Sequence, residues 1–124
     1  MARILVLDDD PALVELLETV IEEAGHIAIA ATTIENVPID LEVDLVMSDL
    51  IPVKSYRREA AQAWVDRLRG RFGVPIVIMT AHRGALTEPD ALGAEAIVGK
   101  PFDIDALAQR FESLLVRPHI LNTP

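Results

Sequence analysis

Polar and charged residues end or directly follow four short apolar runs of this sequence. They are Asp8 and Asp9, Ser48 and Asp49, Thr80, and Lys100. Two carboxylates about 4 Å apart repel each other by roughly 1 to 4 kcal/mol at a surface-like dielectric, and a divalent cation would relieve that repulsion. Magnesium prefers one or two carboxylates together with water and phosphate oxygens, and Asp49 supplies a third acid beside Asp8 and Asp9.

Asp49 and Lys100 together favour phosphoryl-transfer chemistry. A carboxylate is a nucleophile toward a phosphoryl group when a metal and a lysine neutralise the charge on the transferred oxygens. The hydroxyl of Thr80 can donate a hydrogen bond to a phosphoryl oxygen. Each residue alone also has a structural interpretation: Asp49 as a solvated loop aspartate, Thr80 as a strand former and Lys100 as a surface charge. We interpret them as one site because they follow different strands of one predicted sheet.

The elements that must position these residues are five buried strands and three helices, predicted from apolar runs and helical periodicity. The strands are expected at residues 4–7, 27–31, 45–48, 76–79 and 96–98, and the helices at about 11–24, 57–69 and 104–116. Asp10, before Pro11, and Asp103 are placed to cap the first and last helix. The connections 32–37 and 87–92 contain or meet a proline and hold about one helical turn each.

Strands that alternate with helices predict an α/β fold with a parallel sheet covered on both faces, the doubly wound arrangement. In such a sheet, ligands bind outside the carboxyl ends of the strands, where the strand order reverses. All the polar groups named above follow those ends. This placement is the reason to expect that they meet.

Length, charge and composition restrict the function. The chain has 124 residues, a formal net charge of −9 and no cysteine. These values exclude a multidomain enzyme, thiolate metal sites and disulfides, and they make direct nucleic-acid binding unfavourable because phosphate would be repelled. No apolar run approaches the length of a membrane span, and no secretory signal is recognisable at the start, so we expect a cytoplasmic protein without a membrane partner.

Four segments in the expected order carry a resemblance to a known family. They are 7–11 (LDDDP), 44–50 (DLVMSDL), 76–81 (IVIMTA) and 100–102 (KPF). Together they resemble the receiver domain of two-component response regulators. The resemblance implies a flavodoxin-like fold with strand order 2-1-3-4-5, and the prolines at positions 38 and 89 predict that its second and fourth helices are shortened in this sequence. It also implies a receiver domain over residues 1–117, followed by a tail over 118–124.

What the resemblance implies for function is Mg²⁺-dependent transfer of a phosphoryl group to Asp49. The donor would be a phosphohistidine of a histidine kinase or of a histidine phosphotransfer protein. Asp9 and Asp49 would bind the metal directly, Asp8 would act largely through water, and the backbone carbonyl of Ile51 would complete the protein ligands. Thr80 would bind the acyl phosphate and Lys100 would pair with it. Because the chain ends shortly after its last predicted helix, output is expected through an unidentified partner protein.

Two departures from the family pattern, at Pro52 and Ile97, and the residue type at position 51 bear on regulation and output. Pro52 stands three residues after Asp49, where receivers usually have a proline four residues after it. Ile97 replaces the aromatic residue common at that position, so we expect no family-type dimer built on Ile97, Leu107 and Arg110. Ile51 is apolar and cannot orient a water molecule, which predicts slow self-dephosphorylation.

Two other functions fit parts of the pattern. The first is a phosphohydrolase similar to the haloacid-dehalogenase-like enzymes, with Asp8 as nucleophile, but this interpretation leaves Asp49 unexplained. The second is an atypical receiver that acts as a protein-interaction module without phosphorylation. The altered loops favour that second alternative, whereas the intact set of acids and lysine argues against it.

Overall fold

The computed structural model describes residues 1–50, 57–82, 85–86, 92–100 and 102–121. Five parallel strands form one sheet: β1 (Arg3–Leu7), β2 (Ile27–Ala31), β3 (Leu45–Asp49), β4 (Ile76–Thr80) and β5 (Ala96–Gly99). Their order across the sheet is β2-β1-β3-β4-β5, as the resemblance implied. The strand order reverses at β1, which pairs with β2 on one side and with β3 on the other. The carboxyl ends of β1 and β3 therefore flank the switch point of a doubly wound sheet.

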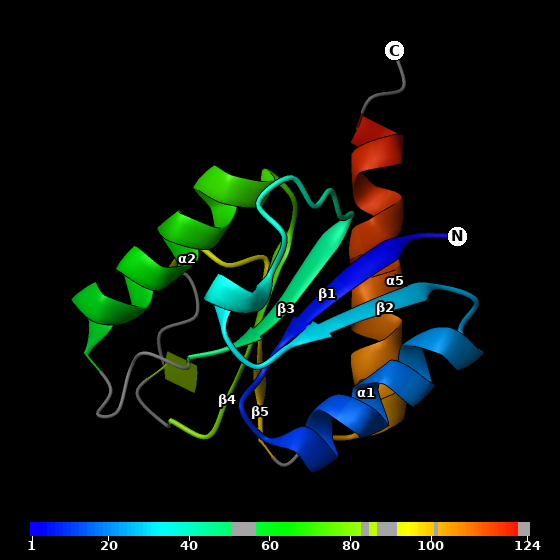
Figure 1. Cartoon of the computed structure of the whole chain (residues 1–124), viewed down its shortest axis with the longest axis horizontal. Helices are drawn as coiled ribbons and strands as arrows, with labels where there is room; N and C mark the ends of the chain where they lie inside the picture. Colours follow the sequence, from blue (N-terminus) through cyan, green and yellow to red (C-terminus); the bar gives the residue numbers. More distant parts are fainter. Residues whose placement is uncertain (51–56, 83–84, 87–91, 101, 122–124) are drawn as a thin grey trace.

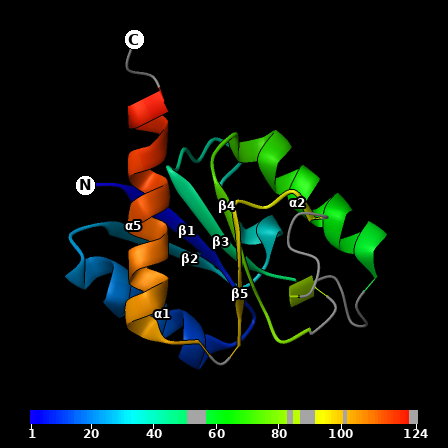
Figure 2. The ribbon, with the colours of Figure 1, turned by 180° about the vertical axis from the view of Figure 1, so that it is seen from behind.

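Helices cover both faces of the sheet (Figures 1 and 2). Helices α1 (Pro11–Glu23) and α5 (Ile104–Leu121) pack on one face, and α2 (Arg58–Phe72) packs on the other with the short 3-10 helix η1 (Ile34–Asn36). Successive residues of a strand point to opposite faces of the sheet. Ile4 and Val6 therefore pack in the core beneath α1 and α5, while Leu5 and Leu7 pack in the core beneath α2 and η1. Both faces of the central strands are buried, as a parallel sheet requires.

The helix ends follow local chemistry. The side chain of Asp10 caps α1 by accepting from the backbone N–H groups of Ala12 and Leu13, at 3.1 and 3.4 Å. Asp103 accepts in the same way from residues 105 and 106 at the start of α5. Helix α2 ends at Phe72 and is capped by Gly73, whose φ of 64° is a left-handed conformation that costs glycine little. Both predicted aspartate caps are thus confirmed.

The helical part of the connection between β2 and β3 is the single turn η1, in agreement with the prediction of about one helical turn. Arg71 of α2 supports this turn, because its guanidinium donates to the carbonyl oxygens of Ile34, Val37 and Pro38 at 3.4, 3.0 and 3.1 Å. The second shortened connection, 87–92, lies almost entirely outside the described residues.

The predicted end of the last helix is wrong. Helix α5 continues to Leu121, past the expected end at about residue 116 and through the first residues of the expected tail. Proline at position 118 removes one backbone N–H donor, but the helix continues on both sides of it. In the part of the chain that is described, no helix is long and apolar enough to cross a membrane.

Candidate functional site

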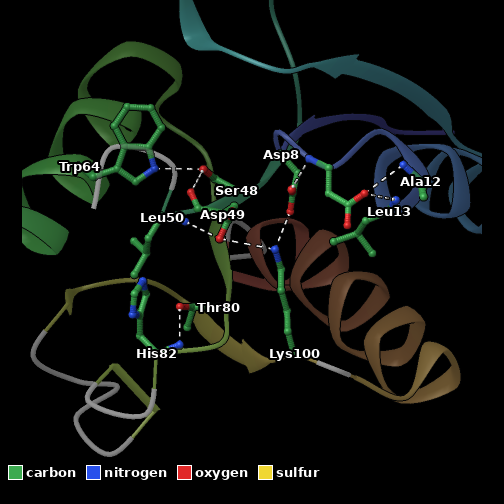
Figure 3. Close-up of polar contacts among 11 residues, drawn as sticks. Asp8, Ala12, Leu13, Ser48, Asp49, Leu50, Trp64, Thr80, His82 and Lys100 are labelled. Carbon is green, nitrogen blue, oxygen red and sulfur yellow. Dashed lines mark hydrogen bonds and ion pairs between the residues drawn. The ribbon is translucent and has the colours of Figure 1, made fainter. Parts of the chain in front are cut away.

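The carboxylates of Asp8, Asp9 and Asp49 and the ammonium group of Lys100 converge at the carboxyl edge of the sheet, and Figure 3 shows three of these four residues, Asp8, Asp49 and Lys100. Asp8 directly follows β1, Asp49 is the last residue of β3, and Lys100 directly follows β5. Asp8, Asp9 and Asp49 each offer a carboxylate oxygen, and these three atoms lie within 4.8 Å of one another. The sequence prediction that these acids meet is therefore confirmed.

Lys100 bridges two of the acids. Its Nζ lies 2.7 Å from Oδ2 of Asp8 and 3.5 Å from Oδ1 of Asp49. The shorter contact is with the more deeply buried carboxylate: the Asp8 side chain is fully buried, whereas the Asp49 side chain is 21% exposed. Lys100 thus acts mainly as the counter-ion of Asp8.

Asp8 and Asp9 differ in what their oxygens already contact. Both oxygens of Asp8 are engaged, because Oδ1 accepts from the backbone N–H of Asp10 at 2.9 Å and Oδ2 accepts from Lys100. Asp9 is exposed, and its side chain makes no hydrogen bond or ion pair within the described ranges. Asp9 is therefore free to bind a ligand directly, whereas Asp8 is held by the protein. The engaged oxygens of Asp8 also argue against a role as nucleophile.

Two pKa values at the site are raised, that of Asp49 mainly by burial and that of Lys100 by its acidic neighbours. Burial raises the pKa of Asp49, and repulsion from Asp8 adds to this, while Lys100 opposes the shift. Burial alone would lower the pKa of Lys100, but its contacts with Asp8 and Asp49 outweigh it, so the pKa is raised. The lysine therefore stays protonated at neutral pH, and a cation near Asp49 would favour its ionised form.

Thr80 lies at the same edge but contacts a different group. It is fully buried, and its Oγ1 accepts from the backbone N–H of His82 at 3.0 Å. Its backbone carbonyl accepts from the backbone N–H of Lys100 at 2.8 Å, so the end of β4 is bonded to the residue that directly follows β5. The hydroxyl oxygen thus accepts one hydrogen bond and its hydrogen can still donate.

Sequence reasoning missed the support behind Asp49. Nε1 of Trp64 donates to Oγ of Ser48 over 3.0 Å, and Ser48 donates to the carbonyl oxygen of Asp49 over 2.7 Å (Figure 3). Trp64 lies on the buried face of α2 and is only 5% exposed. The only available signal was the position of Ser48, a polar residue inside an apolar strand.

The donor chemistry of the site suits a small hard cation. Carboxylate oxygens are the ligands that Mg²⁺ takes from proteins, usually one or two of them together with water and phosphate oxygens. Asp9 and Asp49 are the accessible members of the trio, with Asp8 behind them. Ile51, whose carbonyl was the fourth predicted ligand, lies outside the described residues, as does Pro52.

Curated relatives match nearly the whole chain. The transcriptional regulatory protein GlrR of Escherichia coli strain K12 is 32% identical in a 122-residue alignment that covers 92% of this chain and 26% of GlrR. The DNA-binding dual master transcriptional regulator RpaA of Synechocystis is 30% identical over 122 residues, covering 94% of this chain and 50% of RpaA. The chain thus spans about a quarter to a half of the length of these relatives. No protein-family model matches the sequence.

Solved structures share the fold over their full length. The non-phosphorylated HemR receiver domain from Leptospira biflexa is 27% identical with a TM-score of 0.68, covering 93% of this chain and 94% of that one. A two-component response regulator from Clostridium difficile has a TM-score of 0.76 at 21% identity, covering 99% of this chain and 100% of that one. The second likeness concerns the fold alone.

Proposed function

Because the chain belongs to the response-regulator family as a CheY-like receiver domain, we propose that it accepts a phosphoryl group on Asp49 in a two-component phosphorelay. A receiver of this kind is a signalling protein and not a classical enzyme. The observation that carries the proposal is the convergence of three carboxylates and Lys100 at the switch point of the sheet.

The proposed step is an in-line displacement at phosphorus. An oxygen of the Asp49 carboxylate attacks the phosphoryl group of a phosphohistidine, and an O–P bond forms as the P–N bond breaks. The electron pair of that bond leaves with the imidazole nitrogen. Lys100 supplies positive charge within 3.5 Å of the Asp49 carboxylate, and the hydroxyl hydrogen of Thr80 is available to a phosphoryl oxygen.

Mg²⁺ is part of the proposal. Asp9, Asp49 and the backbone carbonyl of Ile51 would bind it directly, and Asp8 would act largely through water. When bound, the ion would offset the negative charge that gathers where phosphoryl oxygens approach the carboxylates. The two engaged oxygens of Asp8 support its indirect role.

The partners belong to the same proposal. A histidine kinase or a histidine phosphotransfer protein would donate the phosphoryl group, and a separate protein would read the phosphorylated state. The net charge of −9 supports protein partners over direct contact with nucleic acid in this segment.

Intact mass after incubation with Mg²⁺ and acetyl phosphate tests the proposal. We expect one added phosphoryl group on the wild-type chain, no addition in Asp49→Asn, and none after chelation of the metal. Addition that persists in Asp49→Asn would refute the assignment of the acceptor. No addition, together with no Mg²⁺ binding, would instead favour the phosphorylation-independent interaction module.

A further inference from the structure

Ser48 and Trp64 form a buried link from α2 to the main chain of Asp49. The side chains of Ser48 and Trp64 are 0% and 5% exposed, and the two hydrogen bonds of the link measure 3.0 and 2.7 Å. An indole N–H can only donate, so the Ser48 oxygen accepts from Trp64 and the Ser48 hydrogen is directed to the Asp49 carbonyl. Trp64 therefore fixes the direction in which the Ser48 hydroxyl points.

The peptide unit between Asp49 and Leu50 is held at both of its polar ends. Its carbonyl accepts from Ser48, and its N–H, which belongs to Leu50, donates to Oδ1 of Asp49 over 2.8 Å. That same Oδ1 lies 3.5 Å from Nζ of Lys100. Because a peptide unit is planar, turning the carbonyl away from Ser48 would also turn the N–H away from Oδ1. The Ser48 hydroxyl is thus connected to the Asp49 carboxylate through the two polar ends of this peptide unit.

We propose that Ser48 and Trp64 are positioning residues for phosphoryl transfer to Asp49, and that the same link carries the state of Asp49 to α2. This inference rests on the proposed function, since it concerns how the acceptor is held. Neither residue touches the transferred group; both act through the Asp49–Leu50 peptide unit. A Trp64 that served only as core packing would need its ring but not its N–H.

Kinetics of phosphorylation separate positioning from packing. With Mg²⁺ and acetyl phosphate, we expect the phosphorylation rate of Ser48→Ala to fall about three- to tenfold, as for the loss of one hydrogen bond. Ser48→Thr keeps a hydroxyl and should retain most of the rate. Trp64→Phe keeps a ring without the N–H and should lower the rate in the same direction. Val46→Ala is the matched control, because Val46 is fully buried on the same face of β3 but has no polar side-chain group that could hydrogen-bond to Ser48 or Trp64.

Trp64 also reports on the link, because it is the only tryptophan of the chain. Addition of Mg²⁺ and acetyl phosphate should change the indole emission of the wild-type protein. The same addition should leave the emission of Ser48→Ala and of Asp49→Asn unchanged, while Val46→Ala should respond like the wild type. A response that survives in Ser48→Ala would overturn the transmission of the acceptor's state through Ser48.

Amide hydrogen exchange at Leu50 tests the positioning without phosphorylation. If the Ser48 hydroxyl holds the peptide unit, exchange at Leu50 should be about tenfold faster in Ser48→Ala than in Val46→Ala. Equal exchange in these two variants, or a phosphorylation rate unaffected by Ser48→Ala, would refute the inference. A wild-type chain that accepts no phosphoryl group would refute the proposed function instead, and Leu50 exchange would still decide the role of Ser48.

Discussion

Lys100 forms its shorter ion pair with Asp8 and not with the proposed acceptor Asp49. The Nζ–Oδ distances are 2.7 and 3.5 Å, and Asp8 is the fully buried partner. A buried carboxylate without a counter-ion is strongly destabilising, so the lysine stabilises the folded chain as well as serving the site. A phosphoryl group on Asp49 would compete with Asp8 for the same ammonium group.

Replacement of Lys100 should therefore affect stability and phosphorylation together. We expect Lys100→Met to lower the free energy of unfolding by about 1 to 3 kcal/mol at neutral pH, because it leaves the Asp8 carboxylate without its partner. Urea denaturation followed by circular dichroism measures this change. Phosphorylation by acetyl phosphate should be slower in the same variant.

A double-mutant cycle provides the control. Asp8→Asn removes the buried charge, so the Asp8→Asn/Lys100→Met protein should recover part of the stability that Lys100→Met loses. Strictly additive losses in the double variant would show that the 2.7 Å contact contributes nothing to stability.

Mg²⁺ should stabilise the folded protein, because it relieves the repulsion among Asp8, Asp9 and Asp49. At a concentration 100 times the dissociation constant, binding to the folded state alone contributes about 2.7 kcal/mol. Thermal denaturation with Mg²⁺ and with a chelator measures the effect. Asp9→Asn should reduce the Mg²⁺-dependent rise in melting temperature, since Asp9 is the exposed member of the trio.

Glu22→Gln is the matched control for Asp9→Asn. It removes one exposed negative charge from α1, away from the carboxylate trio, and it should leave the response to Mg²⁺ unchanged. An equal reduction of the Mg²⁺-dependent rise in melting temperature in both variants would mean that this rise depends on the net charge of the protein and not on a specific site.

The meeting of Asp8, Asp49 and Lys100 was predictable because parallel strands end at one edge of a sheet. That Lys100 pairs mainly with Asp8 could not be predicted from the sequence, since it depends on how deeply each carboxylate is buried. The contact between Trp64 and Ser48 joins residues 16 positions apart and depends on how α2 packs over β3. The length of α5 was underestimated because one proline weakens a helix without always ending it.

The residue two positions after Asp49 should control the lifetime of the acyl phosphate. An isoleucine side chain has no group that can orient water, so we expect slow self-dephosphorylation and a faster rate in Ile51→Asn. Loss of the phosphoryl mass after removal of the donor measures both rates. Ile51→Val is the control, because it stays apolar and should retain the slow rate. Equal lifetimes in Ile51→Asn and the wild type would contradict the prediction.

Phosphorylation should not produce a dimer through the surface that carries Ile97, Leu107 and Arg110. Leu107 is 1% exposed and packs in the core beneath α5, and Ile97 is only partly exposed and packs against the other core. The buried Leu107 cannot form the apolar centre of an interface, and the partly exposed Ile97 offers only a small apolar surface in place of an aromatic ring. Analytical ultracentrifugation of the phosphorylated protein should therefore show no dimer formed through this surface. Arg110→Glu should leave the sedimentation of the phosphorylated protein unchanged. A phosphorylation-dependent dimer that this substitution abolishes would show that the surface works as it does elsewhere in the family.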